Sequence, residues 1–247
     1  DQYANQQYLE GKAGWCCIQP EDSSKSPVVI KKEGWSFGAA VIDENDHLFI
    51  MWGKTIADDK ETEALDNEEK NIVVEKYDLN GNTLASNYVS LNKTNALRPL
   101  AYGTANLRVK NGILFLSYNT EWTTNQSDGK HHQGIGACLF NQNDLSLLDN
   151  WYNEGSHSFG NTALVTSYGV AVLQMGDEYS RSINVNTYRL GSVNDFENDY
   201  LGSNAHVAVF HAPGTYKYDG NPTYCQLGNI AESNSTMAFS GAVTEIS

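Results

Sequence analysis

The stretch "SHSFGNTALVTSYGVAVLQMGD", residues 156–177, repeats the layout of an earlier stretch, "GWSFGAAVIDENDHLFIMWGK", residues 34–54. In each, a short apolar strand containing a Gly is followed by a polar turn and a second apolar strand. Alignment on that Gly yields two further copies, "AYGTANLRVKNGILFLSYN" at 101–119 and "QLGNIAESNSTMAFSGA" at 226–242. The anchoring glycines are Gly38, Gly103, Gly160 and Gly228. The repetition predicts one β-hairpin used four times.

Two more strands are expected after each of the first three hairpins. The segments are "NIVVEKYDLNGNTLASNYVSL" at 71–91, "HQGIGACLFNQNDLSLLDNWY" at 132–152 and "SINVNTYRLGSVNDFENDYL" at 182–201. The Asn80-Gly81 pair in the first is a strong hairpin signal. Each unit is therefore predicted to be a four-stranded antiparallel meander of about 60 residues, a period typical of propeller blades. No helix of useful length is expected.

On these repeats the chain resembles β-propeller proteins of the small four-bladed type. The resemblance implies an all-β, single-domain fold over residues 1–247, with blades at about 34–92, 98–154 and 156–212. The fourth copy has only two strands, at 222–247, and two strand-like runs lie within 12–32. We expect these N-terminal strands to complete the last blade and close the ring, which would leave no open edge. The alternative is that the chain is a slice of a larger ring.

Long loops are expected on one face of this ring. The turns inside the hairpins are short, whereas the second and third strands are joined by "GKTIADDKETEALDNEEKN", "NTEWTTNQSDGKHHQG" and "GDEYSRS". The connections "NKTNALRP" and "HAPGTYKYDGNPTY" belong to the same face. Because binding residues concentrate on loops held by a rigid scaffold, function is predicted there.

The candidate ligand-binding residues on this face are aromatic rings with polar side chains among them. Rings offer an apolar surface to sugars, and carboxylates and amides bind hydroxyl groups. Trp15 and Trp151 are expected to pack within the strands rather than to bind a ligand. For each other aromatic residue, the alternative to ligand binding is packing between blades. Further polar candidates are Asn119, Asn125, Gln126, Asp128, His131 and His132. The predicted set is Trp35, Trp52, Tyr118, Trp122, His157, Asp177, Glu178, Tyr179 and Tyr224.

No catalytic residue is predicted. Glycosidases need two opposed carboxylates, which in catalytic propellers commonly stand near the start of the innermost strands. The corresponding positions here, three residues before each anchoring Gly, are Trp35, Leu100, His157 and Cys225. None is a carboxylate, and a Cys225–His157 nucleophile pair is a minor alternative.

No cofactor is predicted either, although a calcium site in the acidic segment 58–71 is an alternative to a solvated loop. The adjacent Cys16 and Cys17 are expected to be free buried thiols, or alternatively a vicinal disulfide in an oxidising compartment. Cys138 is expected to be buried and inert.

The composition limits the partners. A formal net charge of −14 disfavours nucleic acid and anionic membranes, and no apolar run is long enough to span a bilayer. We therefore predict a non-catalytic carbohydrate-binding module, extracellular or on a cell surface and part of a larger multidomain protein. Its ligand would be a neutral polysaccharide or oligosaccharide, with a lean towards starch-like α-glucan. A protein-interaction propeller and a carbohydrate-active enzyme are the alternatives.

Overall fold

The computed structural model describes residues 13–22, 24–101, 105–153, 158–166, 169–176, 182–189, 202–211, 224–233 and 236–244. The fold is all-β, as predicted, and its strands form five antiparallel sheets that follow one another along the chain. The first four strands of the chain are β1 (Ala13–Ile18), β2 (Val28–Glu33), β3 (Ser36–Ile42) and β4 (Leu48–Gly53). Then come β5 (Lys70–Tyr77), β6 (Thr83–Ser90), β7 (Ala96–Pro99), β8 (Ala105–Lys110) and β9 (Ile113–Trp122).

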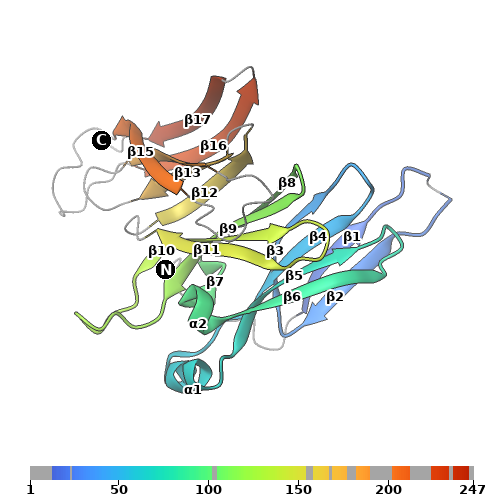
Figure 1. Cartoon of the computed structure of the whole chain (residues 1–247), viewed down its shortest axis with the longest axis horizontal. Coiled ribbons are helices and arrows are strands. Elements are labelled where there is room, and N and C mark those ends of the chain that lie inside the picture. Colours follow the sequence, from blue (N-terminus) through green and yellow to red (C-terminus); the bar gives the residue numbers. More distant parts are fainter. Residues whose placement is uncertain are drawn as a thin grey trace.

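The second half of the chain continues with β10 (Gln133–Asn141), β11 (Leu147–Asn153), β12 (Ser158–Val165) and β13 (Gly169–Gly176). The last strands are β14 (Ser182–Arg189), β15 (Gly202–His211), β16 (Tyr224–Ser233) and β17 (Thr236–Thr244). The sheets are β1–β2, β3–β6, β7–β11, β12–β15 and β16–β17. Figure 1 shows them side by side, with β1 and β2 at one end and β16 and β17 at the other.

The four repeated hairpins are confirmed as β3–β4, β8–β9, β12–β13 and β16–β17. Their first strands contact one another in succession, β3 with β8, β8 with β12 and β12 with β16. The repeated Gly marks a β-bulge, because the register shifts around Gly38, Gly160 and Gly228. A Cβ at Gly38 would overlap the Met51 sulfur on the partner strand, and one at Gly228 would overlap Ser240. A Cβ at Gly160 would meet only Leu227, at an ordinary contact distance, so the feature common to the three described copies is the bulge.

The central strands are buried on both faces, which explains their continuous apolar runs. Alternate residues of β9 point to different neighbours: Leu114, Leu116 and Tyr118 pack towards sheet β3–β6, whereas Ile113 and Phe115 pack towards β12–β15. We call the contact between sheets β3–β6 and β7–β11 the first interface. Its apolar core comes from both sheets and includes Phe49, Met51, Ile72, Val74, Leu114, Leu116, Tyr118 and Phe140.

The contact between sheets β7–β11 and β12–β15, called here the second interface, contains a polar network as well as apolar side chains. The Asn161 Oδ1 atom accepts hydrogen bonds from Ser117 Oγ and Asn106 Nδ2, each at 2.7 Å, and Asn161 Nδ2 donates to Asn119 Oδ1 at 2.6 Å. Ser117 and Asn119 are fully buried. Such groups are tolerated in a core only when hydrogen-bonded, so the network fixes how these two sheets match.

The predicted closure of the ring is wrong. Among the described residues, β1 pairs with β2 and β16 pairs with β17, and no sheet joins the two hairpins, so a four-bladed propeller is not formed. The physical reason is the burial of the N-terminal hairpin. Ile30 packs with Ile50 and Trp52 on sheet β3–β6, and the partly buried Cys16 and Ile18 pack against the same cluster. This packing holds the hairpin at the opposite end of the chain's sheets from β16 and β17 (Figure 1).

The acidic segment 58–71 is only partly the loop expected from the sequence. It forms a 3₁₀ turn, η1 (Asp58–Lys60), and a helix, α1 (Glu61–Asp66); a second short helix, α2 (Leu91–Thr94), follows β6. Acidic residues in the first turn of a helix are favourable beside its unpaired N–H groups. Beneath α1, Ile56, Ala64, Leu91 and Leu97 form a small apolar cluster, which holds the helix against α2 and β7.

In the described part of the chain, no helix has the length and hydropathy needed to cross a bilayer.

Candidate functional site

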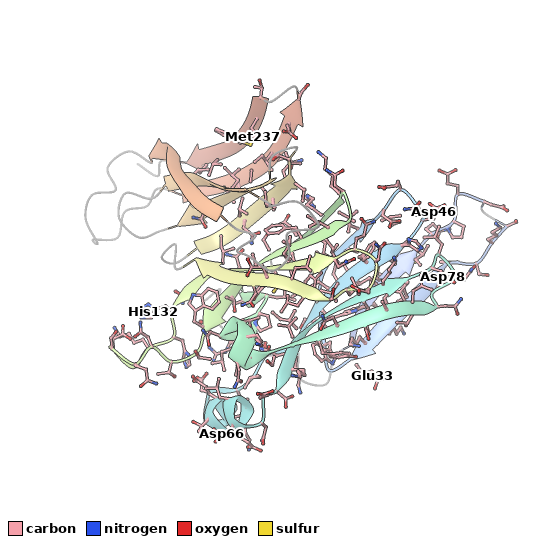
Figure 2. All side chains as sticks on the ribbon, in the orientation of Figure 1. Glu33, Asp46, Asp66, Asp78, His132 and Met237 are labelled. Carbon is pink, nitrogen blue, oxygen red and sulfur yellow. The ribbon has the colours of Figure 1, made fainter. Side chains whose placement is uncertain are left out.

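Two long connections meet at one edge of the molecule, residues 54–69 between β4 and β5 and residues 123–132 between β9 and β10. Figure 2 shows Asp66 and His132, one from each connection, well away from Asp46 and Asp78 in the short hairpin turns. The segment around β7 joins them, because the Thr123 amide donates to Asn95 O at 2.8 Å and the Ile56 amide donates to Leu97 O at 3.0 Å. For these connections the predicted common face is confirmed, and we call this face the loop edge. Residues 177–181 and 212–223, expected on the same face, lie outside the described residues.

Arg98 lies at the centre of the loop edge. It is on β7, paired in register with Glu121 of β9, and its Nη1 atom donates to Glu121 Oε2. Its Nη2 atom donates to Asp58 Oδ1 on η1. The guanidinium therefore bridges two carboxylates from different elements, an arrangement in which charge-assisted hydrogen bonds fix all three side chains.

Glu61, the first residue of α1, connects the helix to the 123–132 loop. Its two carboxylate oxygens accept from the Thr124 amide at 2.7 Å and from Thr124 Oγ1 at 2.8 Å. The residue is nearly buried, so these two hydrogen bonds supply the partners that a desolvated carboxylate needs. The loop and the helix are thus held as one unit.

His131 faces the same carboxylates. Its Nδ1 atom lies 2.9 Å from the Trp122 carbonyl, and because a carbonyl only accepts, we assign the proton to Nδ1. Its Nε2 atom then points to Asp58 Oδ1 at 3.5 Å and Glu61 Oε2 at 3.8 Å. The neighbouring His132 points elsewhere, to Asp128 Oδ2 at 2.8 Å.

These contacts define the Arg98 cluster. Its side chains range from 11% exposed for Glu61 to 62% for Asp58, and those of Arg98, Glu121 and His131 lie between. The cluster is therefore accessible at its rim and rigid at its base. Its members are Asp58, Glu61, Arg98, Glu121 and His131.

The described residues contain no group of three or more His, Cys, Asp or Glu side chains arranged to hold a metal ion. Three carboxylates of the acidic segment, those of Asp58, Glu61 and Glu63, bind Arg98, Thr124 and Lys60, respectively. The calcium alternative in segment 58–71 stays a prediction.

Three of the predicted ligand-binding aromatics are inside the protein. Trp52 is fully buried, Tyr118 is 1% exposed and Trp122 is 6% exposed. Their side chains cannot form a surface platform for a sugar, because they fill the spaces on either side of sheet β3–β6. Trp122 nevertheless contributes to the Arg98 cluster through its backbone carbonyl, which accepts from His131.

Trp35 is the predicted aromatic that remains half-exposed. Its ring meets Tyr88 edge to face, with centroids 6.0 Å apart, and Lys32 Nζ lies 5.6 Å from the Trp35 ring and 5.2 Å from the Tyr88 ring. Lys32 also donates to Glu75 Oε1 at 2.8 Å. These three residues, Lys32, Trp35 and Tyr88, form a separate patch where the N-terminal hairpin covers sheet β3–β6. Trp15, assigned to packing from sequence, is 62% exposed.

The other predicted site residues are not placed by the structure. His157, Asp177, Glu178 and Tyr179 lie outside the described residues. Tyr224 begins β16 opposite Thr244, and its side chain is not described. The site proposed from these five residues stays a prediction.

The cysteines are free thiols where the structure describes them. Cys16 is half-buried and Cys17 is exposed, since adjacent residues of a strand point to opposite faces. The two cysteines are free thiols rather than a vicinal disulfide, but the expected burial is not found, because Cys16 is only partly buried and Cys17 is exposed. Cys138 is buried, as expected, and that burial raises the pKa of its thiol to about 12, which disfavours the reactive thiolate.

Sequence reasoning missed Arg98, Glu121, Asp58 and Glu61 as a group. A signal was present, since the single Arg of "NKTNALRP" and the acidic segment were both assigned to the loop edge. What could not be derived is their convergence, because it depends on β7 pairing with β9 and on α1 packing over Leu91 and Leu97.

Comparisons with known proteins identify no family for this chain. No protein-family model matches the chain, and no curated protein matches it. Among solved structures, an exotype rhamnogalacturonan lyase, YesX, is similar with a TM-score of 0.42 and 12% sequence identity. The match covers 94% of this chain and 43% of that chain, so this chain spans less than half of that protein's length. A similarity at this level supports no inference about activity.

Proposed function

We propose that the protein binds a polysaccharide or oligosaccharide at the loop edge, through the Arg98 cluster. The observation that supports this is a partly exposed array of planar polar groups held in fixed positions by hydrogen bonds from five elements of the fold. Sugar hydroxyls both donate and accept, and planar charged groups bind them with defined geometry. Because the array is ordered before binding, little conformational entropy is lost when a ligand arrives.

Asp58 is the group best placed to contact a ligand. Its Oδ1 atom faces Arg98 and His131, and the side chain is 62% exposed. An ionised carboxylate accepts about four hydrogen bonds. The remaining acceptor positions, chiefly on Oδ2, can therefore receive sugar hydroxyls while Arg98 keeps the carboxylate oriented.

The proposal also includes the predictions from sequence about ligand charge, glycan type and cellular location, and each of these rests on a different observation. The net charge of −14 favours a neutral polymer over an acidic one. The lean towards α-glucan rested on a curved platform of Trp and Tyr rings, and the burial of Trp52, Tyr118 and Trp122 removes that support. Extracellular or cell-surface location, within a larger multidomain protein, rests on composition alone.

Retention in native affinity gels containing amylose, xylan or galactomannan tests the proposal. We expect retention by one polymer and at least a fivefold loss of it in Asp58→Ala and in His131→Ala. Lys60→Ala is the matched control, since Lys60 is exposed on the same turn and pairs with Glu63, outside the cluster. Retention by none of the polymers, with thermal melts showing folded protein, would reject the proposal.

The enzyme alternative needs a different arrangement. In glycoside hydrolysis two carboxyl groups face each other across the scissile bond. Here Asp58 and Glu121 are both bound to the same guanidinium. Release of reducing sugar from a retained polymer, abolished by Glu121→Gln, would favour an enzyme over a binding module.

A further inference from the structure

The charges of the Arg98 cluster bear on which sugars it can accept. Arg98 contributes one positive charge, and Asp58, Glu61 and Glu121 contribute three negative ones. His131 is neutral or singly positive, so the cluster is net negative in either state. Two lysines of the 54–69 connection are paired with carboxylates, Lys60 with Glu63 and Lys54 with Glu69.

Arg98 would otherwise be the natural partner of an acidic sugar. A guanidinium binds carboxylate and sulfate groups with two parallel hydrogen bonds, and it keeps its charge at any physiological pH. In this structure both terminal nitrogens of Arg98 already donate to carboxylates of the protein, Nη1 to Glu121 and Nη2 to Asp58. The guanidinium keeps further N–H groups, but an incoming anion that bound them would lie beside both carboxylates and would be repelled by them at close range.

We propose that Asp58 and Glu121 are specificity-determining residues that exclude acidic sugars from the loop edge by occupying Arg98. This inference rests on the proposed function, because it concerns which glycans that same site accepts. The net charge of the whole protein would also disfavour acidic sugars. The present inference differs because it predicts that removing the charges of Asp58 and Glu121, with their hydrogen bonds to Arg98 kept, allows anions to bind.

The test uses each neutral polymer, amylose, xylan and galactomannan, paired with its carboxymethylated derivative at low salt. The measured quantity is the ratio of retention on the charged polymer to retention on the neutral one. In Asp58→Asn and Glu121→Gln the amide oxygen can still accept from Arg98 while the negative charge is gone. We expect the ratio to rise about two- to fivefold for each substitution, the size typical of partly exposed charges, and further in the double variant.

Glu63→Gln is the matched control. It removes the same charge from a side chain as exposed as Asp58, on the helix that follows η1, but outside the cluster. An unchanged ratio in this variant, with a raised ratio in Asp58→Asn, supports the proposal. Equal retention of wild-type protein on charged and neutral polymers, or an equal rise in all three variants, overturns it and leaves the proposed binding function intact. Retention of wild-type protein on no polymer overturns both.

Discussion

The two interfaces on either side of sheet β7–β11 share the strands of that sheet but differ in chemistry. The first interface is mainly an apolar core; its polar contacts include one buried hydrogen bond, from Asn71 Nδ2 to the Ala96 carbonyl, and the Gln142–Asp43 contact at the rim. The second interface combines apolar residues with the buried network of Asn106, Ser117, Asn119 and Asn161. One strand, β9, supplies both, because alternate side chains face opposite ways.

This difference between the interfaces indicates what fixes the relative position of neighbouring sheets. Apolar packing stabilises any well-filled contact, whereas a buried amide network stabilises only the arrangement in which every partner is present. Polar side chains also cover the backbone edge of β12, the edge strand of its sheet. Its carbonyls at Asn161, Ala163 and Val165 accept from the side chains of Asn106, Arg108 and Lys110, respectively. Side chains of β8 thus cover an edge that no strand covers.

The largest expected effect is in the first interface. Phe49 is fully buried there, and Phe49→Ala should lower the free energy of unfolding by about 3–5 kcal/mol, because a cavity is left among side chains that cannot collapse into it. Urea denaturation gives the value. Phe37→Ala, in the same sheet but 42% exposed, is the control and should cost less than half as much. Equal losses would contradict the assignment of the core.

The second interface should respond to loss of one amide. Asn161→Ala leaves Ser117, Asn106 and Asn119 without a shared partner, and buried unsatisfied groups cost about 1–3 kcal/mol each in free energy of unfolding. We expect a total loss of about 3 kcal/mol. A double-mutant cycle with Ser117→Ala should show coupling, and additive losses would mean that the network does not act as a unit.

The rim of the first interface should make stability depend on pH. Burial raises the pKa of the Asp43 carboxyl, but hydrogen bonds from the His47 amide, Gln142, the His47 ring and the Asn45 amide more than offset it, so the pKa is lowered. A lowered pKa in the folded state means that Asp43 stabilises the fold above its unfolded pKa of about 3.9. This contribution is lost as the pH falls through the lowered value.

Asp43→Asn should therefore be less stable than wild type at pH 7, and the difference in unfolding free energy should shrink below about pH 4. Urea melts from pH 7 to pH 2.5 measure this difference. Glu44→Gln, exposed in the same turn, is the control and should not change the pH profile in this way. A difference that stays constant down to pH 2.5 would show that the Asp43 carboxylate does not hold the rim.

The smallest expected effect is at the edge of the second interface. Lys110 Nζ lies 3.8 Å from Glu232 Oε2 on β16 and 3.4 Å from Val165 O, and its side chain is 42% exposed. Because exposed ion pairs contribute little, Lys110→Met should change the free energy of unfolding by less than about 1 kcal/mol and should reduce its dependence on salt. A loss as large as that of Asn161→Ala would mean that this edge, rather than the network, fixes the second interface.

Local signals predicted the hairpins well. The Asn111-Gly112 turn has both residues at positive φ, at 55° and 79°, as a two-residue hairpin of this kind requires. The apolar runs of β4 and β9 predicted burial on both faces, and that is confirmed. The prediction that Trp52 and Trp122 bind a ligand was wrong. Both lie near the ends of these buried strands, and their side chains are in the core.

By itself, the sequence determined the all-β class, the four hairpins and the common face of the two described long connections, because strand periodicity and turn chemistry are local properties of the chain. Tertiary structure alone decided that the terminal hairpins stay apart, since the N-terminal one buries Ile30 against Ile50 and Trp52 on the sheet that follows it. Tertiary structure also decided which side chains meet at the loop edge. Arg98, Asp58 and Glu121 are distant in sequence, and only the pairing of β7 with β9 and the packing of α1 bring their charges together.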